Sequence, residues 1–476
     1  MKTRNIKDLE GFCGVVLIPV FETHEKNVVP IEFHGVSVSS RVFYGKKDTY
    51  YVAEKYDCVH LFIGLGKSID YKNLKTLMRR IAFKEKALFG KEVALMIPEV
   101  FTLQQVEATV SGLCLGTYHL GHFKKKDIHP FAEKGFELAL LSKTDFSEVA
   151  LRAIKIARTQ IEILYLVDSP PNVVNPAYLA KWAQDSGNTY GFDTKVLDGP
   201  ACKIEGLDAF LAVGKGSDKT PQFIIMNYEP SGDLPKVKHI GLVGKGITFD
   251  TGGLNIKTAA MVHMKSDMAG GAAVLGAMQL IADLKLPIRV TAIVPCCENA
   301  VDNTSFMPSD VIKSYHGATI EIIDTDAEGR LILADGLSYL IKNYKPEIIV
   351  DIATLTGSSV GTFGYECGAL FTNNTTIEQK LRQSGDEIGE RLWPLPLWDA
   401  YQPDIESDIA DVKNYSGKPV AGAISAAKFL EYFTEKHQAW AHLDIAGVAF
   451  GDDEFAKSKH ATAYGVHLLT HFIENI

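Results

Sequence analysis

Apolar runs and helical patterns alternate over the first 145 residues of the chain. Three short apolar runs have the length expected of buried strands, at Gly14–Val20, His60–Gly64 and Val93–Ile97. Two segments with apolar residues at helical spacing lie among them, at Tyr71–Phe83 and Leu103–Ser111. This alternation predicts a small α/β domain over residues 1–145, in which no cluster of ligand-type side chains occurs.

A long helix is predicted next. Apolar residues follow a helical period from Val149 to Ile161, with Asp145 or Ser147 as the N-cap. The segment Asp168–Asn172 contains two consecutive prolines, which end the pattern. We interpret residues 146–168 as a helix that connects two domains, and a surface helix of a single domain is the alternative.

Strand and helix patterns alternate again in residues 169–476. The predicted strands contain much Ile and Val and little polar alternation, which is typical of strands covered by helices on both faces. They are Ile240–Val243, Ile288–Val294, Thr319–Ile323 and Glu347–Ala353, and the predicted helices are Ala269–Leu284 and Leu331–Asn343. The fold class predicted for the chain is α/β with two domains, the second built on a largely parallel central sheet flanked by helices.

Composition narrows the range of functions. The 476 residues include 49 Lys and Arg against 58 Asp and Glu, a net charge of −9 that argues against a general nucleic-acid binder. The seven cysteines are scattered without a Cys-x-x-Cys pair, which fits neither a disulfide framework nor a cysteine zinc site. No run approaches about 18 uninterrupted apolar residues, and no signal-peptide pattern opens the sequence. We therefore expect a soluble, cytoplasmic protein.

Carboxylates gather after two of the predicted strands. These residues are Asp250, Asp267, Asp326 and Glu328. If the backbone after the Thr319 strand is extended, then Asp326, Glu328 and Arg330 project from one face. Four carboxylates at close quarters repel one another unless cations hold them, so the sequence predicts a pair of divalent metals. Carboxylate-dominated sites suit Mg²⁺, Mn²⁺ or Zn²⁺.

Less specific interpretations apply to each motif taken alone. A single Asp or Glu after a strand is most often a cap or a solvated charge, and glycine-rich loops are usually turns. The Gly244–Gly246 segment lacks the rest of a phosphate-binding loop, so nucleotide binding is not predicted. Two alternatives remain: another metal hydrolase, such as a phosphatase with more basic residues around the site, and a non-catalytic scaffold of the same fold.

Five segments of the second domain share a pattern with a known family. They are VGKGITFDTGGLNIK (Val243–Lys257), MKSDMAGGAAV (Met264–Val274), DTDAEGRLILAD (Asp324–Asp335), DIATLTG (Asp351–Gly357) and WAHLDIAG (Trp440–Gly447). Flanking segments agree too, at Asn172–Ala183, Leu211–Asp218, Ser407–Asn414 and Gly422–Leu430. In these motifs the chain resembles the leucyl aminopeptidases, also called cytosol aminopeptidases, which are dinuclear metallopeptidases. The resemblance covers about residues 165–476, and the first 145 residues match only in length and α/β character.

The resemblance implies a metal-dependent aminopeptidase that removes the N-terminal residue, leucine or another apolar one, from unblocked peptides. The implied metal ligands are Lys245, Asp250, Asp267, Asp326 and Glu328. Among them, Asp250 and Glu328 would bridge two metals, and the backbone carbonyl of Asp326 would assist. The implied metals are Zn or Mn, with Mg or Co as further options.

The resemblance assigns catalysis to Lys257 and Arg330. Lys257 would hydrogen-bond the scissile carbonyl and stabilise the developing oxyanion. Arg330, together with backbone near Gly329 and Leu355, would bind a bicarbonate ion that acts as general base. The implied substrate-binding residues are Met264, Thr354, Leu355 and Gly357.

The resemblance also implies a homohexamer that acts on peptides, whereas the charge and the lack of a long apolar run predict neither nucleic acid nor a membrane as partner. The sequence departs from the family pattern in three places. Asp324 stands where Asn is usual, the loop Thr258–His263 is one residue shorter than expected, and Pro308-Ser309-Asp310 replaces a Pro-Gly-Asp turn. None of the departures removes an implied ligand or catalytic residue, so they bear on specificity.

Overall fold

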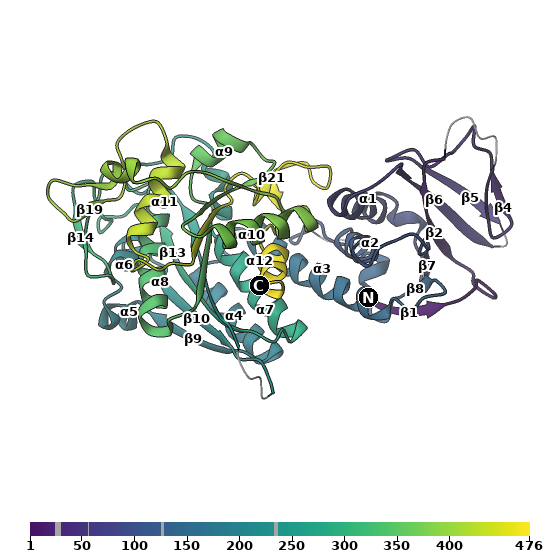
Figure 1. Cartoon of the computed structure of the whole chain (residues 1–476), viewed down its shortest axis with the longest axis horizontal. Helices are drawn as coiled ribbons and strands as arrows, with labels where there is room; N and C mark the ends of the chain where they lie inside the picture. The colour runs from purple at the N-terminus through teal and green to yellow at the C-terminus, as the bar shows by residue number, and fades with distance from the viewer. Residues whose placement is uncertain (24–29, 56, 125–127, 233–236) are drawn as a thin grey trace. The chain divides into compact units, whose positions relative to one another are not determined.

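The computed structural model describes residues 1–23, 30–55, 57–124, 128–232 and 237–476 (Figure 1). These residues form two compact units, Met1–Ile161 and Glu162–Ile476. The division lies inside helix α3 (Ser147–Asp168), which matches the helix predicted over 146–168. The domain boundaries at 145 and 169 stay a prediction.

The first unit contains a six-stranded sheet with the strand order β1-β8-β7-β2-β6-β5. Its strands are β1 (Lys2–Ile6), β2 (Val15–Phe21), β5 (Tyr50–Lys55), β6 (Cys58–Gly66), β7 (Glu92–Met96) and β8 (Glu137–Leu141), and a hairpin of β3 (Ile31–Phe33) and β4 (Val36–Val38) accompanies them. Neighbouring strands are parallel except for β5 and β6. Helices α1 (Tyr71–Lys84) and α2 (Leu103–Leu115) pack so closely that a Cβ on Gly112 would lie 2.3 Å from the Lys75 carbonyl oxygen.

The second unit is built on a nine-stranded sheet. Eight strands run in the order β18-β17-β20-β16-β11-β13-β10-β9, and β12 pairs with the end of β13. Their bounds are β9 (Asp193–Asp198), β10 (Gln222–Tyr228), β11 (His239–Gly244), β12 (Gly246–Asp250), β13 (Arg289–Asn299), β16 (Ile348–Ala353), β17 (Gly368–Thr372), β18 (Leu392–Pro394) and β20 (Trp440–Asp444). The central strands β20, β16, β11 and β13 are parallel, which confirms the predicted fold class.

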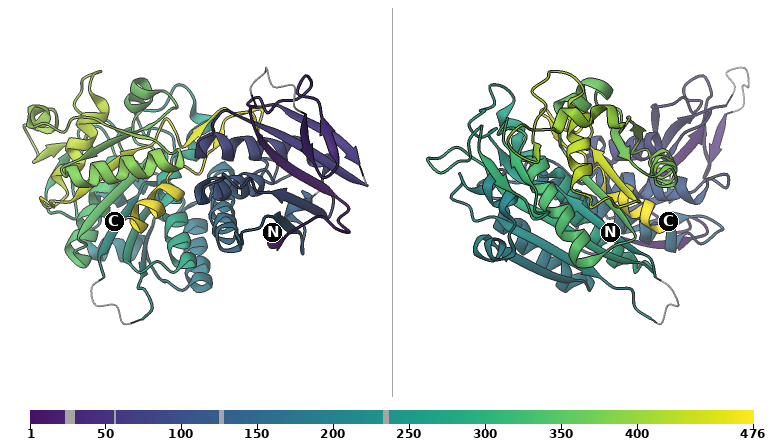
Figure 2. Two further views of the ribbon diagram at one scale, coloured as in Figure 1. Left: turned by 45° about the vertical axis from the view of Figure 1, so that its right-hand side comes forward. Right: turned by 60° about the vertical axis from the view of Figure 1, so that its left-hand side comes forward.

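Helices cover both faces of this sheet (Figure 2). They are α4 (Pro176–Tyr190), α5 (Gly199–Glu205), α6 (Asp208–Gly214), α7 (Ala269–Leu284), α8 (Gly329–Tyr344), α9 (Gly357–Phe363), α10 (Thr375–Ile388), α11 (Gly422–Tyr432) and α12 (Val466–Glu474). A Cβ on Gly244 would lie 2.7 Å from the Gly270 carbonyl oxygen of α7, whereas one on Gly241 would lie 2.6 Å from Leu340 of α8. Strand positions three apart point to opposite faces, so α7 and α8 lie on opposite sides of the sheet.

One predicted strand lies outside the central sheet. The segment predicted at Thr319–Ile323 forms β15 (Thr319–Glu321), which pairs with β14 (Val311–Lys313) and β19 (Val412–Lys413) in a three-stranded side sheet. Its expected place beside the parallel strands is therefore wrong. The tripeptide Thr-Ile-Glu buries only Ile320 completely, so it suits a small sheet open to solvent on one face.

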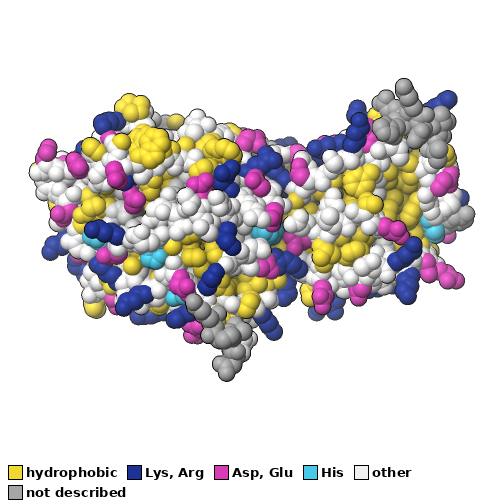
Figure 3. Space-filling view, viewed as in Figure 1, with side chains coloured by type: hydrophobic (Ala, Val, Ile, Leu, Met, Phe, Trp, Pro, Cys, Tyr) yellow, Lys and Arg dark blue, Asp and Glu magenta, His cyan; other side chains and the backbone are white. Residues whose placement is uncertain are grey.

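The Pro308-Ser309-Asp310 segment is a turn, as expected. Ser309 adopts a φ of 77°, a left-handed conformation that glycine accommodates without the strain a side chain brings. A second small sheet pairs β21 (Phe450–Gly451) with β22 (His460–Ala461). Among the described residues, no helix combines the length and apolar character needed to cross a membrane. Acidic and basic side chains are interspersed over the described surface in the view of Figure 3.

Replacing Gly270 by Ala is expected to destabilise the second unit. The added methyl would lie 2.2 Å from the Ile352 carbonyl oxygen and 2.8 Å from the Ala353 Cα, both backbone atoms of β16, which is paired on both sides in the sheet. Overpacking of this kind costs about 1–3 kcal/mol, measured as a lower denaturant midpoint. The control is Gly361→Ala in α9, where nothing lies within 4 Å of the new Cβ and stability should be kept or slightly raised. Equal stability of the two variants would contradict the close packing of α7 on β16.

Candidate metal centre and active-site pocket

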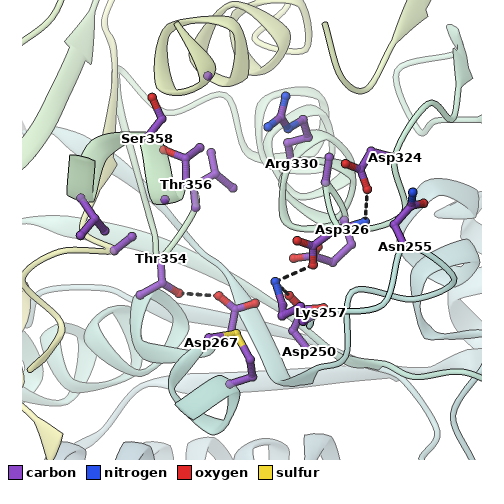
Figure 4. Close-up of a pocket in the computed structure, with 18 of the residues that line it drawn as sticks. Asp250, Asn255, Lys257, Asp267, Asp324, Asp326, Arg330, Thr354, Thr356 and Ser358 are labelled. Carbon is purple, nitrogen blue, oxygen red and sulfur yellow. Dashed lines mark hydrogen bonds and ion pairs between the residues drawn. The ribbon is translucent and has the colours of Figure 1, made fainter. Parts of the chain in front are cut away.

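A pocket of about 890 Å³ lies where the central parallel strands end (Figure 4). Lys245 follows β11, Asp250 ends β12, and Thr354 follows β16. Ligands of open α/β sheets bind at this carboxyl edge, because the loops after parallel strands converge there. The sequence placed its candidate residues at the strand ends, and the structure brings them to one pocket.

Three carboxylates meet on one side of the pocket. One oxygen of each of Asp250, Asp326 and Glu328 lies within 4.8 Å of the others. Asp250 and Glu328 are buried, at 2% and 1% exposure, whereas Asp326 faces the open space. The fourth carboxylate, Asp267, lies in the same pocket beside Thr354, whose hydroxyl donates to its Oδ1 at 2.9 Å.

A turn and a helix start bring Asp326, Glu328 and Arg330 together. The Asp326 N–H donates to Asp324 Oδ1 at 2.8 Å, which closes the turn (Figure 4). Glu328 has helical angles, φ −75° and ψ −35°, at the start of α8, and Arg330 lies in the first turn of that helix. The expectation that an extended backbone aligns these side chains is therefore wrong, although the three residues do line the same pocket.

Two ammonium groups, that of the buried Lys245 and that of the partly exposed Lys257, hold the carboxylates in place. Lys245 Nζ lies 2.7 Å from Asp267 Oδ2 and 2.8 Å from Glu328 Oε1. Lys257 Nζ lies 2.8 Å from Asp250 Oδ2 and 2.5 Å from Asp326 Oδ1. Burial disfavours both ammonium charges, but the surrounding carboxylates outweigh burial, so the pKa of each lysine is raised.

The positive charges of the two lysines do not balance the negative charges of the four carboxylates. Partial burial of Asp326, whose side chain is 34% exposed, followed by repulsion from Glu328 and Asp250, raises the pKa of its carboxyl to about 7. Burial likewise raises the pKa of Asp267 and that of Glu328. Glu328 Oε2 is buried without a hydrogen-bond partner among the described residues. A buried carboxylate oxygen with no donor is costly, so this donor set fits additional cations, and the residues present suit divalent metals.

Arg330 forms a second charged feature of the pocket. Its side chain is 5% exposed, and its Nε and Nη1 have no hydrogen-bond partner in the described part of the chain. Burial lowers the pKa of the guanidinium to about 10, even though Glu328 and Asp324 act in the opposite direction. Arg330 also lies where the first N–H groups of α8 have no helical acceptor. An unpaired guanidinium beside a helix N-terminus can hold a small anion.

The turn after β16 is anchored by Asp444, the last residue of β20. Asp444 Oδ1 accepts from the Leu355 N–H at 3.1 Å, and its Oδ2 accepts from the Thr356 hydroxyl at 2.6 Å. The Thr354 carbonyl accepts from Lys245 Nζ at 3.1 Å. This turn therefore links the ammonium of Lys245 to the wall of the pocket. Asp444 belongs to the motif Trp440–Gly447, but a single Asp in a strand does not indicate that it anchors a turn.

The pocket contains almost every candidate residue. The lining includes Lys245, Asp250, Lys257, Met264, Asp267, Asp326, Glu328, Arg330, Thr354, Leu355 and Gly357. The candidate Gly329 adjoins it at the start of α8. Residues that were not predicted also line it: Asn255, Ser358, Tyr415, Lys418, Ala446 and Phe450. Asp324 and the loop residues Thr258 and Ala259 contribute as well, so two of the departures from the family pattern lie in the pocket itself.

The second unit matches a known protein family, and some relatives match most of the whole chain. A family model described as Peptidase_M17, cytosol aminopeptidase family, catalytic domain, matches residues 164–470. A probable cytosol aminopeptidase of Chlorobium phaeobacteroides is 36% identical over 92% of this chain and 89% of its own length. One from Geobacter is 40% identical over 87% of this chain and 85% of its own length.

Other relatives match over a shorter region. A probable cytosol aminopeptidase of Chloroherpeton thalassium is 45% identical over 67% of this chain, and this match spans 62% of that relative.

A solved structure, the bottromycin maturation enzyme BotP in complex with Mn, superposes with a TM-score of 0.85 at 27% identity, covering 97% of this chain and 99% of that one. The chain belongs to the cytosol aminopeptidase, or leucyl aminopeptidase, family and is a hydrolase of that type.

Proposed function

We propose that the protein removes N-terminal leucine or other apolar residues from unblocked peptides, with two divalent metals bound in the pocket. The observation that carries the proposal is the set of four carboxylates whose charge the lysines do not balance, together with the unpartnered Glu328 Oε2. One ammonium for each acid would balance the charges as ordinary ion pairs, but here each of the two ammonium groups is shared between two carboxylates. An excess of buried acids at the edge of a sheet is typical of a metal site.

The donor set divides into two overlapping groups. Lys245, Asp250, Asp267 and Glu328 would hold one metal. Asp250, Asp326 and Glu328 would hold the other, with help from the Asp326 carbonyl, so Asp250 and Glu328 belong to both groups. When bound, the metals would supply Lewis-acid polarisation of the scissile carbonyl and activation of water. Zn or Mn is proposed as the native metal, with Mg or Co as options.

Lys245 has to be neutral to act as a ligand. Its raised pKa comes from the attraction of Asp267, Glu328 and Asp250. Cations bound to these carboxylates would remove that attraction, and burial would then favour the neutral amine. Proton loss from Lys245 and metal binding are therefore coupled in this proposal.

Lys257 is proposed to act on the substrate. The Lys257 side chain is 19% exposed, and its ammonium lies on the open side of the carboxylates. The neighbouring acids raise its pKa, so the group stays charged. A charged donor at this position can hydrogen-bond the scissile carbonyl oxygen and stabilise the negative charge that develops on it.

Arg330 is proposed to hold a bicarbonate ion. When bound, this ion would supply a general base, a role that the protein's own residues in the pocket leave open. The unpaired Nε and Nη1 of Arg330 and the backbone at Gly329 support the assignment. Leu355 was predicted to share in this site, but its N–H already donates to Asp444 Oδ1. The proposal therefore rests on Arg330 and Gly329.

The apolar part of the pocket is proposed to hold the N-terminal side chain of the substrate. Met264 lines it together with Ala259, Val360 and Phe450. Thr354, Leu355 and Gly357 belong to the turn after β16 and line the same pocket, where they would position the peptide backbone. A homohexameric assembly stays a prediction from the family resemblance, and a cytoplasmic location stays a prediction from the sequence pattern.

Removing the metals is expected to abolish hydrolysis. Protein treated with a chelator and dialysed should release no leucine from an unblocked leucyl amide, and Mn²⁺ or Zn²⁺ should restore the activity. The bridging acids have too little other counter-charge to build the site without cations. Full activity of a preparation that contains no metal by elemental analysis would contradict the proposal. Release of phosphate from a generic phosphate ester, without amino-acid release, would favour the phosphatase alternative.

A further inference from the structure

Asn299 joins the two chain segments that supply the carboxylate cluster. It is the last residue of β13 and is 0% exposed. Its Nδ2 donates to Asp250 Oδ1 at 2.8 Å and to the Thr325 carbonyl at 3.1 Å. Its own carbonyl accepts from the N–H and the hydroxyl of Thr251, each at 2.9 Å. One amide thus ties the end of β12 to the turn that carries Asp326.

The hydrogen bonds to Asp250 distinguish its two oxygens. Oδ1 accepts from Asn299 Nδ2 and from the Gly252 N–H, both at 2.8 Å. Two N–H donors occupy the lone-pair directions of that oxygen. Oδ2 is the oxygen that faces the pocket, where it meets Lys257 at 2.8 Å. Asp250 is therefore oriented so that one oxygen is held by the protein and the other faces the pocket, where the proposed metals would bind.

We propose that Asn299 is a positioning residue that fixes Asp250 for metal binding and sets its spacing to Asp326. The inference rests on the proposed function, because it needs metals at these carboxylates. The proposed positioning role requires an amide at position 299 and not a carboxylate. Both neighbours of Nδ2, a carboxylate oxygen and a carbonyl oxygen, are acceptors, so only an N–H donor satisfies them.

The test compares Asn299→Asp and Asn299→Ala with the unmodified protein. Asn299→Asp keeps the size of the side chain but replaces the donor by a further acid next to Asp250. Mn²⁺ affinity is measured on metal-stripped protein by competition with a chelator. Loss of a group that orients a metal ligand typically weakens binding by about 10–100-fold, and both variants should fall in this range.

Asn227→Ala is the matched control. Asn227 lies on β10, and its amide oxygen accepts from Thr291 near the opposite end of β13 at 2.9 Å. The control removes an amide from the same sheet without touching the carboxylates. Its Mn²⁺ affinity should stay within about 3-fold of the unmodified protein, since distant sites are usually independent.

A spectroscopic readout separates positioning from a merely structural role. The visible absorption of bound Co²⁺ depends on the ligand geometry, so the Asn299 variants should show an altered Co²⁺ spectrum while their metal-free circular dichroism stays native. Unchanged Mn²⁺ affinity and Co²⁺ spectrum in Asn299→Asp would overturn the inference. So would a loss of the native circular dichroism in both variants, because the role would then be structural. If the unmodified protein binds no Mn²⁺ at all, the proposed function fails instead.

Discussion

Replacing Glu328 by Ala should remove both metals together and reduce kcat/KM by at least about 10³-fold. Glu328 is 1% exposed, pairs with Lys245 through Oε1 at 2.8 Å, and keeps Oε2 free of donors. Glu328 would belong to both proposed donor groups, so its loss should affect both metals. Elemental analysis of the purified variant gives the metal content, and amino-acid release from a leucyl amide gives the activity.

Glu298→Ala is the matched control for this experiment. Glu298 precedes Asn299 on β13 and accepts from the Ser217 hydroxyl at 2.6 Å, outside the carboxylate cluster. The control should keep two metals per chain and most of the activity. A Glu328→Ala protein that retained one metal at full occupancy would show that Glu328 does not bridge, and the division of ligands would have to change.

Replacing Arg330 by Ala should lower kcat by about 10²–10⁴-fold while leaving two metals bound. The guanidinium has two donors without partners and contacts no proposed ligand through a hydrogen bond in the described structure, so the metals do not depend on it. The loss should appear mainly in kcat, because a general base acts in the transition state. Arg330→Lys keeps the charge but loses the planar fork that matches a carbonate-like anion, so it should recover only part of the activity.

Bicarbonate depletion provides the independent check on Arg330. The unmodified protein should lose activity when bicarbonate is rigorously removed and regain it on re-addition, whereas Arg330→Ala should respond to neither change. Arg289→Ala, which breaks an exposed ion pair with Glu229, serves as control and should behave like the unmodified protein. A normal kcat in Arg330→Ala, or loss of its metals, would refute the role given to this residue.

Local patterns predicted the elements whose residues are buried most uniformly. The apolar run Ala269–Leu284 forms α7 with the same bounds, and the pattern at Leu331–Asn343 lies within α8. Residues Ala269–Ala282 of α7 and Gly329–Leu340 of α8 are buried, so most positions of each helix contribute to the pattern. The strand at Thr319 was recognised, but its place in the side sheet was not, since sheet membership depends on β14 and β19 from distant parts of the chain.

The charged part of the site could be predicted from the sequence, whereas the neutral residues that orient it could not. A single acid after a strand is usually a cap or a solvated charge, but four acids gathered after two strands need cations, so Asp250 and Glu328 stood out. Asn299 and Asn414 carry no such signal. Asn414 is 0% exposed, and its amide accepts from the Ile323 N–H at 2.8 Å and donates to the Asp324 carbonyl at 2.6 Å. Only the folded chain shows that these amides hold the turn in place.

A comparison of one dipeptide with free and acetylated amino termini tests the proposed activity most directly. The metal-loaded protein is incubated with leucyl-alanine and with N-acetyl-leucyl-alanine, and free leucine is measured. We expect leucine from the unblocked peptide alone, because the free amine has to approach the cations held by Asp250, Asp326 and Glu328. Equal cleavage of the acetylated peptide, or no release from either peptide by protein that holds two metals, would contradict the proposal.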